Sequence, residues 1–248
     1  MMNKHWVRTA VAAAMLAGSG AVMAEVGGTV AITSDYLFDG VSQTVNDPAL
    51  QVGFDISDES GFYAGIWASN VDFETESDIE TDHYIGYGWG SEAVAFDVGY
   101  VRYKYLDGLE NGDFNLSDYG EWYFGVTFAE NTTVKYWYAP DYPAATEFDG
   151  DKNAAHRVKV THNIAINDQL SVGLEFTHSM DIYAGYDAIN DEVVIDDLNH
   201  FRVGVGYALS DAFAFDLSYH KTDADKDYAD EDIFSIDGNI VLTATYSY

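Results

Sequence analysis

Residues 239–248 read Asn-Ile-Val-Leu-Thr-Ala-Thr-Tyr-Ser-Tyr, and this stretch decides the fold class because two kinds of residue alternate along it. One set comprises Ile240, Leu242, Ala244, Tyr246 and Tyr248. The other set comprises Asn239, Val241, Thr243, Thr245 and Ser247. A period of two residues is typical of a β-strand whose two faces meet different surroundings. The same alternation recurs at 201–207 and 213–220.

Extending this search along the chain predicts twelve strands. They lie at about 27–38, 48–57, 61–72, 79–89, 93–106, 117–129, 132–140, 153–166, 169–180, 196–209, 212–222 and 234–248. The alternation in 93–106 changes phase near Tyr100–Tyr103, which predicts a β-bulge there. The pattern in 61–72 does not decide which residues face inward.

The connections between these segments fall into two classes. Five are short turns, at 58–60, 90–92, 130–131, 167–168 and 210–211. Six are longer and acidic, at 39–47, 73–78, 107–116, 141–152, 181–195 and 223–233. Short and long connections alternate strictly, as an all-β, up-and-down antiparallel transmembrane β-barrel of twelve strands with both termini in the periplasm requires. A secreted β-sandwich would also show alternating strands, but its connections have no reason to sort by length.

The first 24 residues predict export. Met1–Arg8 carries two cations and no acid, 9–22 is uncharged and apolar, and Val22-Met23-Ala24 offers small side chains for cleavage before Glu25. This is the order of a signal peptide, and the apolar run is too short for a transmembrane helix. The expected organisation is therefore a signal peptide at 1–24 and a barrel at 25–248, placed in the outer membrane of a Gram-negative bacterium.

Composition narrows the class of protein further. The chain has 42 acidic and 11 basic residues and a formal net charge of −31, so it lacks the basic footprint of a nucleic-acid-binding protein. It contains no cysteine but 19 Tyr, which suits strands. We expect the strand that ends at Tyr248 to be recognised by the barrel assembly machinery. The aromatic residues expected in the membrane-interface girdles are Trp67, Trp89, Trp122, Tyr136, Tyr138, Tyr207 and Tyr219.

Two stretches near the start of the mature chain carry a family resemblance. They are 34–44, continued at 48–51, and 60–71, and a shorter signature lies at 138–142. Together they resemble the opening of the TorF family of proteobacterial porins, over about the first third of the mature chain. The motif residues are Ser34, Tyr36, Gly40, Ser42, Gln43, Thr44, Gly61, Tyr63, Gly65 and Trp67. The resemblance implies an outer-membrane barrel with a pore, but the pattern usually has Arg where this chain has Asp39, so no anion preference is carried over.

The scarce basic residues indicate what fills the lumen. Lys135, Arg157, Lys159 and Arg202 alternate with apolar residues, so we expect them to face inward. The inward-phase acids Glu80, Asp82, Asp97 and Glu121 are expected roughly across the barrel from them. Glu175 and Asp216 are expected beside the cations. The predicted pore-lining set is Lys135, Arg157, Lys159, Arg202, Asp97, Glu121, Glu175 and Asp216. Twelve strands lie between filled and open barrels in size, so a narrow pore and a closed, salt-bridged interior both remain possible.

Neither an enzyme nor a metal or cofactor site is predicted. Ser218 and His220 share a strand face, but that face points into the lumen, so we interpret them as a polar lumen pair. Asp223, Asp225 and Asp227 begin like a calcium loop that then lacks the required glycine and glutamate.

The predicted function is a porin-like channel for passive diffusion of small solutes or ions through a narrow, charge-lined lumen. The alternative is a closed structural or adhesive barrel whose acidic loops bind divalent cations, lipopolysaccharide or a partner. Outer-membrane lipid and lipopolysaccharide are expected around either barrel.

Overall fold

The computed structural model describes residues 25–72, 77–107, 118–143, 152–187, 192–224 and 233–248. Its strands are β1 (Glu25–Thr33), β2 (Leu37–Phe38), β3 (Val41–Ser42), β4 (Ala49–Ser57), β5 (Phe62–Asn70), β6 (Ser77–Gly90), β7 (Val94–Asp107), β8 (Tyr119–Phe128), β9 (Thr132–Tyr142), β10 (Asn153–Ala165), β11 (Leu170–Asp187), β12 (Glu192–Ala208), β13 (Phe213–Thr222) and β14 (Asn239–Ser247). The predicted signal peptide, 1–24, lies outside the described residues.

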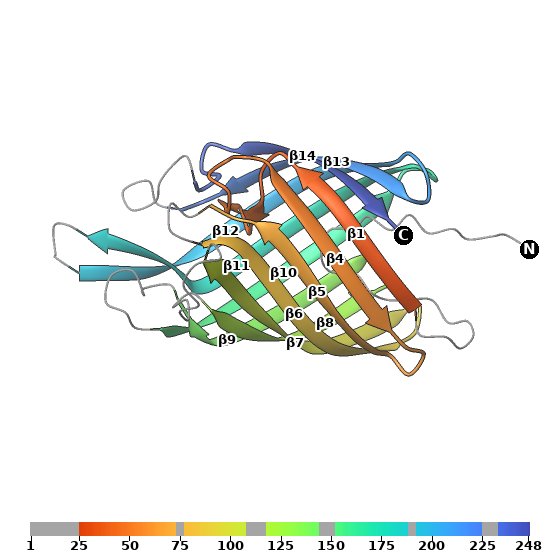
Figure 1. Ribbon diagram of the computed structural model, residues 1–248, viewed down its shortest axis with the longest axis horizontal. Helices are drawn as coiled ribbons and strands as arrows, with labels where there is room; N and C mark the ends of the chain where they lie inside the picture. The colour runs from red at the N-terminus through yellow and green to blue at the C-terminus, as the bar shows by residue number, and fades with distance from the viewer. Residues whose placement is uncertain (1–24, 73–76, 108–117, 144–151, 188–191, 225–232) are drawn as a thin grey trace, which may run out of the picture.

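Twelve of these strands form one closed barrel, as the sequence predicts. Each strand pairs antiparallel with its neighbour in the chain, and β1 closes the barrel by pairing with both β4 and β14 (Figure 1). The five short turns lie at one end, where β1 begins and β14 ends, and the longer connections lie at the other. We call these the turn end and the loop end. Closure pairs the edge strands, so the barrel itself presents no open sheet edge.

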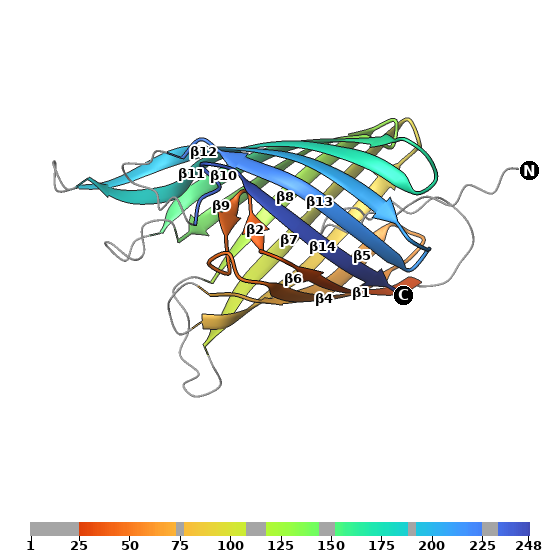
Figure 2. The same ribbon diagram turned by 90° about the horizontal axis from the view of Figure 1, so that it is seen from above.

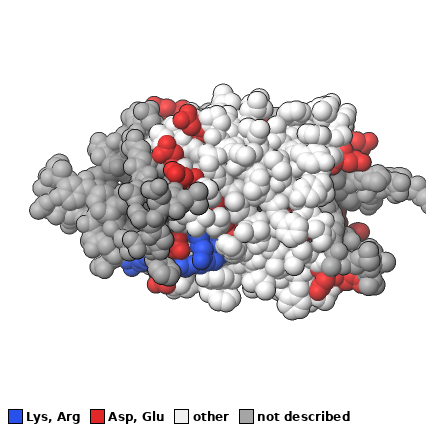
Figure 3. All heavy atoms as spheres, in the orientation of Figure 1, with Lys and Arg blue, Asp and Glu red and all other residues white. Residues whose placement is uncertain are grey.

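The strands alternate between an apolar outer face and a polar inner face. On β13 the outward residues Phe215, Leu217 and Tyr219 are 39–53% exposed, whereas the inward Ser218 and His220 are at most 8% exposed. Figure 3 shows the result, an uncharged belt between ends that carry the acidic groups. An apolar belt around a polar interior is the reverse of a water-soluble barrel and fits a lipid surround. No helix among the described residues is long and apolar enough to cross a membrane.

The first expected strand, 27–38, is wrong at its end. β1 stops at Thr33, and residues 34–48, which we call the inward loop, fold into the lumen and carry the small hairpin of β2 and β3 (Figure 2). The last expected strand also starts too early, because β14 begins at Asn239. Residues before it pair with the inward loop, through a bridge between Val41 and Phe234.

Two further expectations need correction. Strand pairing runs without a register shift through Tyr100–Tyr103, so β7 has no bulge there. The sequence pattern changes because, from this point on β7, the outward residues are basic and the inward residues are aromatic. Within the long connection expected at 181–195, residues 181–187 and 192–195 are strand, because β11 and β12 continue to pair beyond the barrel. Their register shift between Ser179 and Tyr183 contains Asp181 at φ 57°.

The pattern of β5 becomes clear only in the barrel. Phe62 and Ile66 face outward, at 57% and 40% exposed. Trp67 has the opposite phase and packs on Tyr36 of the inward loop, with ring centroids 5.3 Å apart. Trp67 therefore does not belong to the interface girdles, because its ring packs on half-buried Tyr36 inside the barrel. The other girdle residues are exposed, including Trp89, Trp122 and Tyr207.

Candidate functional site in the barrel lumen

The inward loop is organised around Asp35, which is 4% exposed. Its carboxylate accepts hydrogen bonds from the hydroxyls of Ser42 at 2.6 Å and Thr44 at 3.2 Å. Its second oxygen accepts the Asn239 amide at 2.7 Å, which ties the loop to β14. A carboxylate that accepts several local donors stabilises a turn in place of a regular strand. This explains why β1 stops at Thr33 although the sequence pattern continues.

Gly40 forms the tip of the inward loop and has φ +86°. A Cβ at this position would lie 2.4 Å from Thr222 and 2.7 Å from His200, so only glycine fits both the conformation and the space. The flanking backbone is held by two hydrogen bonds to the segment before β14. Ser235 N donates to Gly40 O, and Ser42 N donates to Ile233 O.

The two motif stretches quoted above meet in the structure. The first supplies the inward loop, and the second supplies β5 and the turn before it. Tyr36 and Trp67 are the contact between them. On the same inward face Tyr63 donates its hydroxyl proton to Asp97 of β7 at 2.5 Å. The family motif therefore covers both the inward loop and the part of the barrel wall against which that loop packs.

Asp39 anchors the inward loop to the far wall of the lumen, at β10. Its carboxylate accepts Arg157 Nη1 of β10 at 3.0 Å, and Arg157 Nη2 donates to Glu121 Oε2 of β8 at 2.7 Å. The guanidinium lies 4.5 Å from the ring centroids of both Phe38 and Trp137. These three charged side chains are only 3–5% exposed. Charge pairing and cation–π contact together compensate for desolvation of the guanidinium.

A second cation holds the other oxygen of Asp39. Lys159 Nζ lies 2.9 Å from Asp39 Oδ1 and 3.1 Å from Glu175 Oε1. Burial alone would raise the pKa of Asp39, but Lys159 and Arg157 outweigh it and hold that pKa well below its usual range. Asp39, Glu175 and His200 offer ligand atoms within 4.8 Å of one another. The cation that their carboxylates already bind is the Lys159 ammonium.

The ion pairs nearer the turn end are more open. Lys135 Nζ lies 3.0 Å from Asp97 Oδ2, and the side chains are 15% and 20% exposed. Arg202 Nη2 lies 2.5 Å from Asp216 Oδ1, and these side chains are 14% and 12% exposed. The lumen wall is thus accessible beyond the inward loop, whereas the Asp39–Arg157–Glu121 network is closed.

Two of the expected acids lie beside the lumen cations as predicted, but the prediction that the others lie across the barrel from them is wrong. Glu175 and Asp216 do lie beside cations. Asp97 and Glu121 were expected across the barrel but are bonded to Lys135 and Arg157. One intervening strand separates each pair, and long side chains reach over it. Around the four cations the interior therefore contains short-range ion pairs in place of the expected transverse field, whereas Glu80 of β6 accepts a hydrogen bond from Tyr105. The pore-lining role of these residues remains a proposal.

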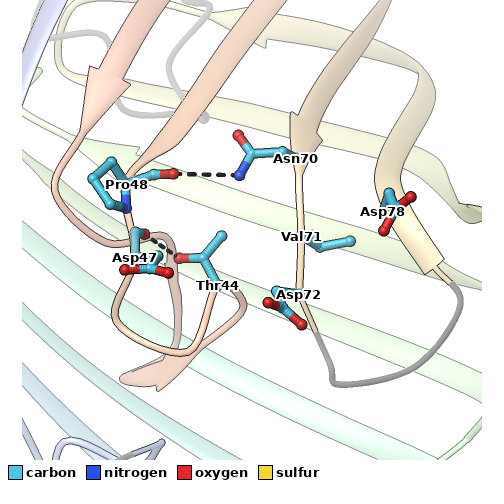
Figure 4. A pocket seen from close by; sticks show the side chains of 7 residues that line it. All are labelled: Thr44, Asp47, Pro48, Asn70, Val71, Asp72 and Asp78. Carbon is cyan, nitrogen blue, oxygen red and sulfur yellow. Dashed lines mark hydrogen bonds between the residues drawn. The ribbon is translucent and has the colours of Figure 1, made fainter.

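A cavity of about 570 Å³ opens at the loop end, between the inward loop and the connection of β5 to β6. We call it the acidic vestibule, because Asp47, Asp72 and Asp78 surround it and no Lys or Arg is among its lining residues (Figure 4). Thr44 donates to Asp47 O, and Asn70 donates to Pro48 O, so hydrogen bonds hold the rim. A concave, acidic mouth concentrates cations.

Ser218 and His220 do form a buried pair, with His220 Nε2 3.0 Å from Ser218 Oγ. His220 Nδ1 lies 3.0 Å from His200 Nε2, which makes a chain of polar groups along the inner wall. Both Ser218 and His220 are at most 8% exposed. A nucleophile with this burial is poorly reached by a substrate, which favours the structural interpretation.

Sequence reasoning missed Asp39 and Asp35 as functional residues. It assigned Asp39 to an acidic external loop, whereas the structure places it in the most buried ion-pair network. The available signal was the departure from the family pattern at that position, where an acid stands in place of a cation. An acid there complements Arg157 and Lys159.

A family model described as a bacterial protein of unknown function (Gcw_chp) matches residues 17–248. The NanC porin has a similar structure, with a TM-score of 0.52 and 10% identity over 90% of this chain and 99% of that one. The KdgM porin in complex with disordered oligogalacturonate has a TM-score of 0.50 and 7% identity over 90% of this chain and 98% of that one. At these identities the likeness shows the fold alone. No curated protein sequence matches this chain.

Proposed function

The chain belongs to the Gcw_chp family, and we propose that it is a porin-like channel of the outer membrane for passive diffusion of small solutes or ions, with cations preferred at the mouth. One observation carries this proposal. Inside the barrel, the charged side chains of the wall beyond the inward loop remain 12–20% exposed, whereas a filled interior would bury them. The resemblance of the motif residues to TorF porins supports the same function.

The path has three parts. The acidic vestibule collects cations at the loop end, the inward loop narrows the lumen at Asp39, and paired charges line the wall toward the turn end. The ion pairs leave no large field of one sign at the narrow part. Selectivity therefore comes mainly from the vestibule, and it should be mild.

A specific observation favours a second candidate, a closed barrel with a structural or adhesive role. Asp39, Arg157 and Glu121 are nearly inaccessible and bridge the loop to the wall. If this network spans the whole cross-section, no solute passes.

Planar-bilayer recording of the refolded chain, beside an Asp39→Asn variant, separates the two. The variant removes the charge that holds Arg157 and Lys159 to the loop, so the loop should loosen and single-channel conductance should rise. Asp211→Asn is the matched control, because it removes one negative charge from an exposed short turn away from the inward loop and the acidic vestibule. A parent and a variant that both fail to conduct would establish the closed barrel.

Export and assembly remain proposals. Residues 1–24 are proposed to act as a cleaved signal peptide, so protein purified from outer membranes should have the intact mass of Glu25–Tyr248. A retained apolar N-terminus would contradict cleavage. β14 is the proposed recognition strand for the assembly machinery, and it closes the barrel against β1, where Tyr248 N donates to Gly28 O at 3.1 Å.

A further inference from the structure

Basic residues are unevenly distributed over the described part of the chain. Lys135, Arg157, Lys159 and Arg202 point into the lumen. Three others, Arg102, Lys104 and Lys152, form what we call the outer basic patch, and Lys221 lies apart from them on β13. Arg102 and Lys104 share the outward face of β7, and Lys152 directly precedes β10. Figure 3 shows the Lys and Arg atoms of this face gathered at the loop end of the uncharged belt.

Two members of the patch, Arg102 and Lys152, meet at Asp118. Lys152 Nζ donates to the Asp118 backbone oxygen at 2.6 Å, and Arg102 Nη2 lies 3.9 Å from the Asp118 carboxylate. The other Asp118 oxygen accepts the Tyr105 backbone N–H, so this acid neutralises the patch only in part. Partial burial, and then the nearby Arg102, lower the pKa of Lys152. An anion bound among the three cations would relieve that repulsion.

The position of the patch relative to the apolar belt indicates the kind of anion. One step toward the turn end on β7, Tyr100 packs against Trp122 of β8, with ring centroids 4.9 Å apart. Trp122 is 59% exposed, as expected for an aromatic side chain at a membrane interface. Arg102 and Lys104 lie just past this aromatic pair, toward the loop end of β7. The short turns at the opposite end contain no Lys or Arg.

We propose that the outer basic patch binds the phosphate groups of a lipid headgroup in the leaflet that surrounds the loop end. Basic side chains next to a membrane surface attract anionic headgroups, and the adjacent apolar belt receives the acyl chains. This inference rests on the proposed place of the barrel in the outer membrane. It does not rest on an open lumen, since the patch lies outside the barrel wall.

The test compares binding of diphosphorylated lipid A to the purified, detergent-solubilised barrel and to an Arg102→Gln/Lys104→Gln/Lys152→Gln variant, by native mass spectrometry. Each basic residue at a membrane surface contributes about a factor of five, so affinity should fall on the order of 100-fold. Lys221→Gln is the control, because Lys221 is outward and exposed on β13. That variant should bind as the parent does.

Three results would overturn the proposal. They are unchanged binding by the triple variant, equal binding of lipid A stripped of its phosphates, and displacement of the lipid by millimolar inorganic phosphate, which would indicate a site for the free anion. Single-channel conductance of the same variant should match that of the parent. A barrel that binds the lipid yet never conducts would overturn the channel and leave the lipid site standing.

Discussion

The loop-end and turn-end halves of the lumen use the same residue types to different effect. At the loop end, Arg157 is held by Asp39 and Glu121, with all three side chains 3–5% exposed. At the turn end, Lys135–Asp97 and Arg202–Asp216 are also bonded, yet those side chains are 12–20% exposed. The difference is the inward loop, which covers the first network and leaves the others open. The inward loop can thus narrow the lumen of the barrel without any change in the strands of the wall.

The largest effect expected from this difference is on stability. Arg157→Gln leaves Asp39 and Glu121 buried without their shared cation, which should cost about 3–5 kcal/mol of unfolding free energy. Arg202→Gln removes a cation from a more accessible pair, so its cost should be clearly smaller. Urea unfolding in detergent, followed by tryptophan fluorescence, measures both. Equal losses would mean that the inward loop adds nothing to burial of the network.

A smaller effect is expected on selectivity from the turn-end wall. Lys135→Gln and Arg202→Gln together leave Asp97 and Asp216 as unpaired acids in the accessible part of the lumen. The cation-to-anion permeability ratio should rise on the order of twofold, because charges in a narrow lumen are screened less than exposed ones. Arg157 and Lys159 are left unchanged, since replacing them would also release the loop.

Reversal potentials across a salt gradient measure this ratio. Lys221→Gln, which removes a cation from the outer face, is the control and should not change it. A ratio equal to that of the parent in the double variant would remove Lys135 and Arg202 from the proposed path.

The smallest effect is expected at the acidic vestibule, and only at low salt. Replacing Asp47, Asp72 and Asp78 by Asn should lower cation preference near 0.1 M salt, where charges act over about 10 Å, and should have little effect near 1 M, where they act over about 3 Å. Conductance recorded over this range measures the change. The matched control replaces Glu92, Asp168 and Asp211, three acids of the short turns, by their amides. The same response from both variants would show that net charge, and not the vestibule, sets the preference.

The barrel itself was predictable because its causes are local. Alternation along Ile240–Tyr248 sets which side chains meet lipid, and the strict order of short and long connections sets the topology. The inward phase of Lys135, Arg157, Lys159 and Arg202 follows from the same period of two. For these residues a strand fixes the direction of the side chain whatever its neighbours are.

The ion-pair partners and the inward loop were decided only by tertiary structure. Whether Glu121 lies across the barrel from Arg157 or reaches it over one strand depends on strand tilt and side-chain length, which no sequence pattern contains. Asp39 sits in a stretch that reads as an external acidic loop, and Asp35, Ser42 and Thr44 turn that stretch inward. The buried position of Asp39 depends on partners more than a hundred residues away in the sequence, because a buried charge is stable only beside an opposite charge.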